Sequence, residues 1–391
     1  MGTFMLILGI VLFLSLVIIH ELGHFWVAKR NGVKPEEFGV FFPPRLWKKR
    51  MKGGWDFSVN LLPLGGFVKL KGEHDSDTAK GSFGAATDRA KAKIMLAGVA
   101  LNLVTALGLF TVLAWTGMPN IPALINNQFT VKSDTKVIHR SALAGLVEPG
   151  SPAAKAGLQR LDDLKTISNG QKTVTIGDTP LSQATKQFAG QTVTVRYNRQ
   201  GDSKAAKITL LSAATVEASR KTSEPKGYLG IVPFEYSLQR STWSAPIVAV
   251  GLTVQMTKMT LAGLWNAVQG LGGIIAGAVT GNTAARQNAQ TEASSQVSGP
   301  VGIFIVLKEM GTLGMPFLLF IIAIISLTLA IMNVLPIPAL DGGRLYLMLA
   351  SRLTKAKRLT PDMEEKIVGA SFLLLLGLIV LITIVDVRRF F

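Results

Sequence analysis

The sequence predicts a polytopic α-helical membrane protein with about four transmembrane helices, a membrane-associated β-hairpin and an inserted α+β domain. Hydrophobic residues occupy 48% of the 391 positions and charged residues only 17%, and the mean hydropathy is +0.37. Apolar runs of about 20 residues, the length that crosses a bilayer, recur along the chain. The charges gather between these runs, as they do where helices cross a membrane.

The formal net charge is +17, and the basic residues border the apolar segments, where anionic lipid and the positive-inside rule favour them. No basic stripe with interleaved aromatic residues is present, so we expect no nucleic-acid partner. The chain has no cysteine, which excludes disulfides, thiolate metal sites and cysteine catalysis. It leaves the cellular compartment undecided.

The first apolar segment, Thr3 to Val27, is predicted to be a retained transmembrane helix. It lacks the basic start and the small-residue cleavage site of a signal peptide. Lys29 and Arg30 end it, and from Lys29 to Lys93 the chain has 14 Lys and Arg against 7 Asp and Glu. The positive-inside rule places this loop in the cytoplasm and the amino terminus outside.

This first helix contains the sequence His20-Glu21-Leu22-Gly23-His24. Residues four apart share a helix face, so His20 and His24 can bind one zinc ion while Glu21 handles a water molecule at the metal. A charge at bilayer depth costs roughly 2.5 to 3.5 kcal/mol, which makes an unpaired Glu21 on a lipid face unfavourable. The motif therefore predicts an intramembrane metal site that needs a third ligand.

The cytoplasmic loop contains a predicted β-hairpin. The stretch Asp56 to Lys71 alternates like strands around a turn at Pro63 and Gly65-Gly66, and Phe67-Val68-Lys69-Leu70 resumes the strand. One interpretation is a small cytosolic hairpin. The other is a sheet edge near the metal that receives an extended peptide by strand addition.

The second predicted span runs from Ile94 to Trp115 and carries Gly98 and Asn102 four residues apart. Small residues allow helices to approach closely in lipid. Taken alone, Asn102 is more typical of a hydrogen bond in helix packing than of a catalytic group.

Residues 119–240 have the composition of a soluble domain with turn clusters between short β-type runs. These runs are Leu143 to Val147, Thr192 to Tyr197, Lys207 to Leu211 and Tyr228 to Phe234. Between the first two, Ser151 is predicted to cap a short helix that begins at Pro152 and ends at Gly157. This order resembles a PDZ domain of the bacterial, permuted kind, although Leu161 stands where such domains usually carry glycine. The alternative is an unrelated small β-rich domain.

Ser244 to Thr280 is apolar and rich in small residues, and it either spans the membrane or lies at its interface. Gly281 to Ser298 is a polar linker by composition. Ser298-Gly299-Pro300-Val301-Gly302 is then predicted to open a helix that continues to about Met310.

Phe317 to Leu335 is a clear span, and Ile367 to Val385 is predicted to be the last one. Prolines at 336 and 338 break the chain after the first of these spans. Irregular backbone at membrane depth is tolerated only where it lines a polar or protein-packed site. Asp341 follows at once, which makes it the best candidate for the third metal ligand, whereas neighbouring arginines account for Asp386.

Topology supports the choice of Asp341. If the first helix runs inward, the second runs outward and Ser244 to Thr280 does not cross, then the Phe317 segment runs inward and delivers Asp341 to the side of His20 and His24. If Ser244 to Thr280 did cross, the basic stretch Arg344 to Lys366, with 6 Lys and Arg against 3 acids, would lie outside. An interfacial or re-entrant segment is therefore expected there.

Two histidines and one carboxylate leave a fourth zinc position for water, which is typical of a catalytic site. Glu21 is expected to take a proton from that water and to pass it to the leaving amine.

Taken together, these features resemble the site-2 protease family of intramembrane zinc metalloproteases, specifically the bacterial regulator of sigma-E protease type. The matching parts run nearly end to end: His20 to His24, the Gly98 to Asn102 spacing, Leu62 to Lys69, the PDZ-like insertion, Ser298-Gly299-Pro300 and Asn333 to Gly342. The chain departs from the best-known members by carrying one recognisable PDZ domain instead of two.

The resemblance implies one Zn²⁺ ion held by His20, His24 and Asp341, with Glu21 as the base. It also implies substrate positioning, for which the candidate residues are Gly65, Gly66, Phe67 and Val68 of the hairpin, Asn333 and Asn102. The implied function is regulated intramembrane proteolysis of a single-pass membrane protein already cut by another protease, such as an anti-sigma factor or a remnant signal peptide. The location that the resemblance implies is a bacterial inner membrane.

The predicted organisation has four parts. Residues 1–118 form the first half of a membrane protease core, 119–240 an extracytoplasmic PDZ-like domain, 241–310 an interfacial amphipathic or re-entrant segment with a linker, and 311–391 the second half of the core. The active site is expected toward the cytoplasm. Two other hypotheses remain at this point: a membrane zinc transporter and an inactive membrane adaptor that acts through its PDZ domain.

Overall fold

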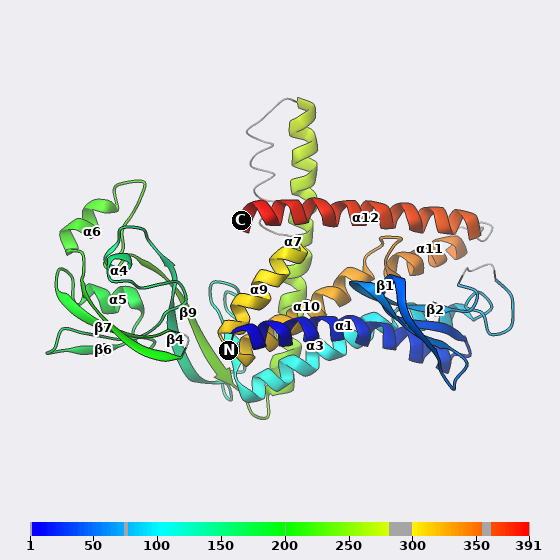
Figure 1. Ribbon diagram of the computed structural model, residues 1–391, viewed down its shortest axis with the longest axis horizontal. Coiled ribbons are helices and arrows are strands. Elements are labelled where there is room, and N and C mark those ends of the chain that lie inside the picture. Colours follow the sequence, from blue (N-terminus) through cyan, green and yellow to red (C-terminus); the bar gives the residue numbers. More distant parts are fainter. Residues whose placement is uncertain (1, 74–76, 200, 281–298, 354–360, 391) are drawn as a thin grey trace. The chain divides into compact units, whose positions relative to one another are not determined.

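The computed structural model describes residues 2–73, 77–199, 201–280, 299–353 and 361–390, and it separates into two compact units (Figure 1). One unit comprises Thr111–Gly251, and the other comprises Gly2–Phe110 together with Leu252–Phe391. The predicted linker Gly281 to Ser298 lies outside the described residues.

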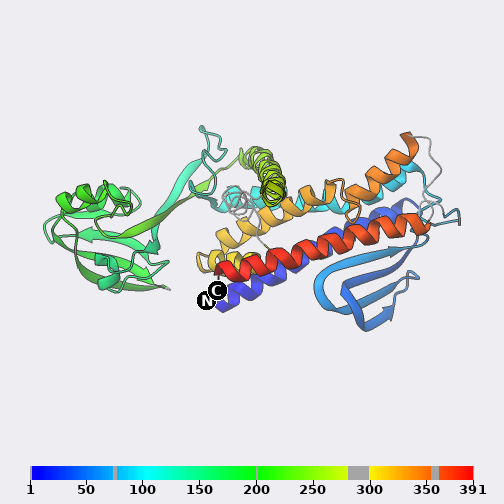
Figure 2. The same cartoon turned by 90° about the horizontal axis from the view of Figure 1, so that it is seen from above.

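The unit built from both ends of the chain is mainly helical. Its helices are α1 (Gly2–Arg30), α2 (Asp88–Met95), α3 (Ala97–Thr116), α7 (Ala245–Thr280), α9 (Pro300–Thr312), α10 (Met315–Val334), α11 (Asp341–Leu353) and α12 (Pro361–Phe390), of which α3 and α7 continue into the other unit. An apolar cluster that contains Leu16, Leu307 and Leu318 joins α1 to α9 and α10. Figure 2 shows α1 and α9 close together near the amino terminus of α1.

Among the described residues, five helices are long and apolar enough to cross a membrane, which confirms a polytopic membrane protein. The candidate spans are Thr3–Arg30, Ala97–Thr116, Ala245–Gly270, Met315–Val334 and Asp362–Arg388. Four of them correspond to the predicted spans, and the fifth is the segment predicted to be interfacial or re-entrant. This segment runs as one helix of 36 residues, α7, and its interfacial or re-entrant course stays a prediction. Its glycines remain compatible with helix in an apolar segment.

The segment between α1 and α2 forms a two-stranded sheet of β1 (Pro35–Arg50) and β2 (Asp56–Leu70). The predicted hairpin within Asp56 to Lys71 needs correction, because its two limbs do not pair with each other. Glu37 pairs with both Lys69 and Asp56, so the first part of β1 lies between the two ends of β2. The limb Gly66–Leu70 therefore pairs with β1 on one side, and no described strand pairs with its other side.

The unit Thr111–Gly251 contains a seven-stranded sheet in the order β3-β9-β4-β5-β7-β8, with β6 paired to β5. The strands are β3 (Met118–Asn120), β4 (Lys136–Val147), β5 (Asp163–Ser168), β6 (Thr173–Thr175), β7 (Thr192–Arg199), β8 (Asp202–Thr209) and β9 (Ile231–Arg240), and the short helices are α4 (Pro152–Lys155), α5 (Leu181–Lys186) and α6 (Ala213–Ser219). Each predicted β-type run overlaps one of these strands.

The predicted helix cap in this unit is present. The Ser151 hydroxyl accepts a hydrogen bond from the Ala154 N–H, Pro152 begins α4, and Gly157 follows the helix with φ +77°. Leu161 occupies the left-handed region with φ +69° at the position where a glycine was expected. The buried Asp162 carboxylate then accepts two hydrogen bonds of 2.7 Å from Arg199, so an ion pair stabilises the turn that a glycine would have made easier.

Candidate metal centre

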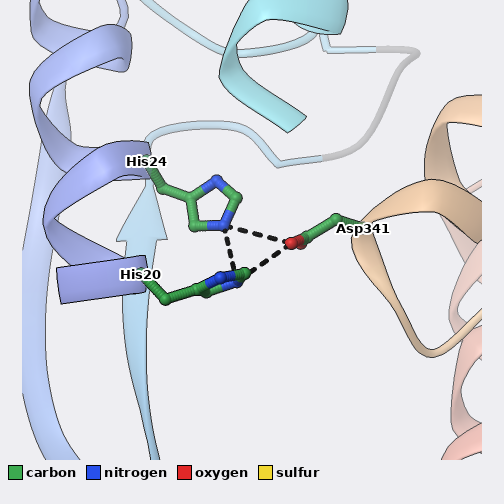
Figure 3. A group of neighbouring side chains, drawn as sticks. All are labelled: His20, His24 and Asp341. Atoms are coloured by element: carbon green, nitrogen blue, oxygen red, sulfur yellow. Dashed lines mark hydrogen bonds and ion pairs between the residues drawn. The ribbon is translucent and has the colours of Figure 1, made fainter. Parts of the chain in front are cut away.

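The carboxyl-terminal half of α1 presents two imidazoles on one face. His20 and His24 are one helical turn apart, and their Nε2 atoms lie 3.2 Å from each other. Asp341 is the first residue of α11, and its Oδ2 atom lies 3.0 Å from Nε2 of His20 and 3.2 Å from Nε2 of His24 (Figure 3). Three donor atoms from two distant parts of the sequence therefore converge on one point.

The convergence has the character of a metal site. Oδ2 of Asp341 is buried and makes no hydrogen bond of acceptable geometry, despite the two nearby nitrogens. Two ring nitrogens and a carboxylate oxygen within 4.8 Å of one another match the donor types of a catalytic zinc site, in which Zn–N and Zn–O distances are about 2.0 to 2.2 Å. The residues therefore fit one zinc ion with His20, His24 and Asp341 as ligands.

Each histidine has a hydrogen-bond partner on its other ring nitrogen. Nδ1 of His24 lies 2.8 Å from the carbonyl oxygen of Ile94, so this nitrogen carries the proton and Nε2 is free for the metal. Nδ1 of His20 lies 3.2 Å from Nδ2 of the buried Asn102 amide, and Oδ1 of the same amide has no hydrogen-bond partner. With the amide turned by 180°, which exchanges its nitrogen and oxygen, Oδ1 accepts from Nδ1–H and His20 has the same tautomer as His24. Asn102 thus lies behind a ligand, on the far side from the metal.

Close backbone approach explains several glycines around the centre. A Cβ at Gly98 would lie 2.5 Å from Nε2 of His24 and 2.6 Å from Cε1 of His20. Likewise, a Cβ at Gly342 would collide with the carbonyl of Val334, and one at Gly343 with that of Ile337. These glycines let α3 pass under the imidazoles and let the chain after α10 fold back tightly enough to bring in Asp341.

Glu21 lies against the free limb of β2. Its Cγ atom would lie 3.1 Å from a Cβ at Gly66. These residues line a cavity of about 420 Å³ that also contains His24 and Asp341. The base candidate, two metal ligands and a strand edge therefore share one space.

The structure does not bring every predicted positioning residue to this cavity. Gly66, Phe67 and Val68 line it. Gly65 does not, and it packs against the ring of Phe42 instead. Asn333 donates its amide N–H to the carbonyl of Leu329 within α10 and is not part of the lining.

Sequence reasoning missed several residues of the cavity wall and of the helix packing. Glu73, Phe83 and Arg344 line the cavity, and the only available signal was that Arg344 lies one helical turn after Asp341. Asp386 was attributed to neighbouring arginines, which is wrong. Its carboxylate is buried and accepts a 2.8 Å hydrogen bond from the N–H of Gly302 in the first turn of α9.

Comparison with known proteins gives a consistent result over the whole chain. The family model described as Peptidase family M50 matches residues 8–378. A protein of Clostridium perfringens named for zinc metalloprotease activity is 29% identical over 387 residues, which cover 98% of each chain. The regulator of sigma-E protease of Salmonella typhimurium is 24% identical over 468 aligned positions, which cover 97% of this chain and 96% of the relative.

Proposed function

Because the chain belongs to peptidase family M50, the site-2 protease family, and is a zinc metalloprotease of the membrane, we propose that it hydrolyses single-pass membrane proteins within or beside the bilayer. One observation carries the proposal. Glu21 and two of the three converging ligands, His24 and Asp341, line a cavity together with a limb of β2 that has one free edge. A hydrolytic site and a place for an extended peptide are therefore adjacent.

The chain's own residues divide the chemical work. Zinc, when bound, supplies Lewis acidity that polarises a carbonyl and makes a water molecule acidic near neutral pH. The Glu21 carboxylate takes a proton from the attacking water and transfers it to the nitrogen of the leaving amine. Ile94 and Asn102 keep the two imidazoles oriented through their Nδ1 atoms.

The substrate binds in an extended form along Gly66–Leu70 of β2. In a helix the carbonyl groups are hydrogen-bonded and hidden, so a transmembrane substrate must unwind before its peptide bond meets the catalytic groups. Strand addition supplies main-chain hydrogen bonds that stabilise the unwound form. Glu21, Gly66 and Val68 line the same cavity, so the carboxylate lies beside this limb.

The proposed substrates are membrane proteins already trimmed by another protease, such as anti-sigma factors or remnant signal peptides. The name of the Salmonella relative, regulator of sigma-E protease, supports a link to sigma-factor regulation. The unit between Met118 and Arg240 acts as a PDZ-like domain that either restricts access to short external stubs or recognises a new carboxyl terminus. Its strand and helix order supports the PDZ assignment.

The proposed location is a bacterial inner membrane, with the amino terminus and the PDZ-like domain outside and the metal centre toward the cytoplasm. The excess of Lys and Arg between α1 and α3 supports this orientation. The proposed organisation keeps the four predicted parts of the chain, with boundaries at residues 118, 240 and 310. A zinc transporter or an inactive adaptor is disfavoured, because neither needs a base at Glu21 or a strand edge at the metal.

The proposal is tested with purified protein in detergent and a model single-pass substrate whose external part has been shortened. We expect cleavage that a zinc chelator abolishes and added Zn²⁺ restores. The Asp341→Asn variant should bind less zinc and lose activity in parallel. Cleavage that survives complete zinc removal would contradict the proposal.

A further inference from the structure

Two basic side chains, Arg344 and Lys91, lie at the ring of Phe83 in the cavity wall. Arg344 lies on α11 one turn after Asp341, so both side chains project from the same face of that helix. The Arg344 guanidinium lies 5.9 Å from the centre of the Phe83 ring, and the ammonium of Lys91 lies 5.8 Å from the same ring. Two cations therefore share one aromatic ring that lines the cavity.

Arg344 keeps most of its hydrogen-bonding capacity unused. The Nη2 atom donates a hydrogen bond to the backbone carbonyl of Glu73 at 3.1 Å. The same atom forms an ion pair with the Glu364 carboxylate at 3.8 Å, which is beyond hydrogen-bond distance. Arginine has five N–H donors, and the others on Arg344 have no hydrogen-bond partner among the described residues. The side chain is 34% exposed and its ion pair with Glu364 is long, so most of its N–H donors remain available in a partly buried place.

The strand edge also ends at this point. The backbone N–H of Leu70 donates to the Glu73 carboxylate at 2.8 Å, so it is not available to a peptide added along the limb. This bond also turns the Glu73 charge toward the strand. A substrate that pairs with Gly66–Lys69 therefore leaves the edge beside Arg344.

We propose that Arg344 forms an anion-binding subsite that receives the side-chain carboxylate of an Asp or Glu residue of the substrate. The proposal rests on the proposed function and names a specificity determinant of the same cleft. A planar guanidinium with free N–H groups binds a carboxylate through two parallel hydrogen bonds. The subsite lies beyond the residues that pair with β2, and it selects substrates with an acidic residue at one fixed position from the scissile bond.

The test uses a set of model substrates that carry a single Asp at successive positions on either side of the scissile bond, each matched by an Asn substrate. At one position we expect about tenfold higher kcat/KM for Asp than for Asn, the size of a charge-assisted hydrogen bond. Arg344→Gln should abolish the preference for Asp. Arg344→Glu should instead favour a substrate that carries Lys at that position. Arg344→Lys, which keeps the charge, should retain part of it.

The matched control is Glu364→Gln, which removes the acid nearest to Arg344 and should leave the Asp preference intact. Zinc content should be equal in all variants. A parent protein without any Asp preference, or an Arg344→Gln variant that keeps the preference, would overturn the subsite.

Binding separates this inference from the proposed function. The same peptides are titrated into the Glu21→Gln variant, with affinity measured by fluorescence anisotropy. A preference for Asp in binding without turnover by the parent would reject the protease while supporting the subsite. Turnover by the parent with equal binding of Asp and Asn peptides would reject the subsite alone.

Discussion

At the scale of single residues, the spacing of His20 and His24 was enough to predict one helix face with two ligands. The choice of Asp341 needed the topology of the whole chain, because an Asp-Gly pair by itself indicates a turn. Asn102 was placed with the substrate, whereas the structure puts it on Nδ1 of His20. Sequence spacing cannot distinguish these roles, because both require a polar side chain at the depth of the histidines.

Asn102 is expected to control zinc affinity through the orientation of His20. Replacing it by Leu removes the acceptor for Nδ1–H and should weaken zinc binding by about 10- to 100-fold, the usual effect of losing such a partner. Asn102→Asp keeps an acceptor oxygen and should retain most of the affinity. Competition with a chromogenic chelator measures both, and equal affinity of the Leu variant and the parent would contradict the assignment.

Gly98 is expected to tolerate no side chain. A Cβ there would approach both imidazoles to about 2.5 Å, so Gly98→Ala should displace the ligands and reduce zinc occupancy. Gly108→Ala on the same helix is the matched control, because a Cβ there has no neighbouring atom within 4 Å. Full zinc occupancy in the Gly98→Ala protein would show that the helix backbone moves to make room.

At the scale of elements, the apolar helices were predictable because length and hydropathy alone determine them. β1 was missed, since Pro43, Pro44 and a basic run obscure the alternation of a strand. The pairing of β1 could not be predicted from a local pattern, because both segments that pair with it belong to β2. The partner of Asp386 was equally non-local, since 84 residues separate it from Gly302.

Asp386 is expected to hold α12 to α9. Removing the acceptor with Asp386→Leu leaves the Gly302 N–H buried without a partner, which costs about 1–3 kcal/mol. Asp386→Asn retains an acceptor oxygen and should cost less. Asp362→Asn near the start of α12 is the control, because its exposed pair with Lys366 is worth about 0.3–0.5 kcal/mol. Denaturant unfolding in detergent measures the free energies, and equal losses for all three variants would contradict the role.

Asp134 joins a loop to the residues that precede α7. The hydroxyl and backbone N–H groups of Ser244 and Thr242 hold the pKa of its carboxyl well below the usual range. A carboxyl group whose pKa is lower in the folded state stabilises the fold at pH values above its unfolded-state pKa of about 3.9. This stabilisation is lost as the pH falls below that value toward the folded-state pKa.

The corresponding prediction concerns thermal unfolding between pH 6 and pH 3. The Tm of the parent should fall more steeply below about pH 4 than that of Asp134→Asn, which has no charge to lose. Asp202→Asn on β8 is the control and should follow the parent. Superimposable pH profiles for the parent and Asp134→Asn would exclude Asp134 as the titrating group.

At the scale of the whole molecule, the direction of the helices bears on the crossing of α7. Gly311, just before α10, packs against Met5 of α1, and Asp341, just after α10, meets His20 and His24. Helices α1 and α10 therefore run in the same direction. A crossing by α7 would require a return crossing before α10. In the described part of that stretch, residues 299–314, the helix α9 has 13 residues and is shorter than the roughly 20 that a span needs.

This argument predicts that α7 does not cross the membrane. The chain has no cysteine, so single cysteines can report sidedness in right-side-out vesicles treated with an impermeant maleimide. Thr173→Cys and Thr291→Cys should both be labelled from outside, and Thr78→Cys only after lysis. Protection of Thr291→Cys together with labelling of Thr173→Cys would show that α7 crosses.

The central claim is that Glu21 acts as the base beside a zinc ion held by His20, His24 and Asp341. The most direct test measures zinc content and cleavage of a transmembrane substrate for the parent and for Glu21→Gln. We expect one zinc ion per chain in both proteins and a loss of cleavage of about 10²- to 10⁴-fold in the variant, the range for a general acid–base group. Undiminished cleavage by a zinc-loaded Glu21→Gln protein would contradict the claim.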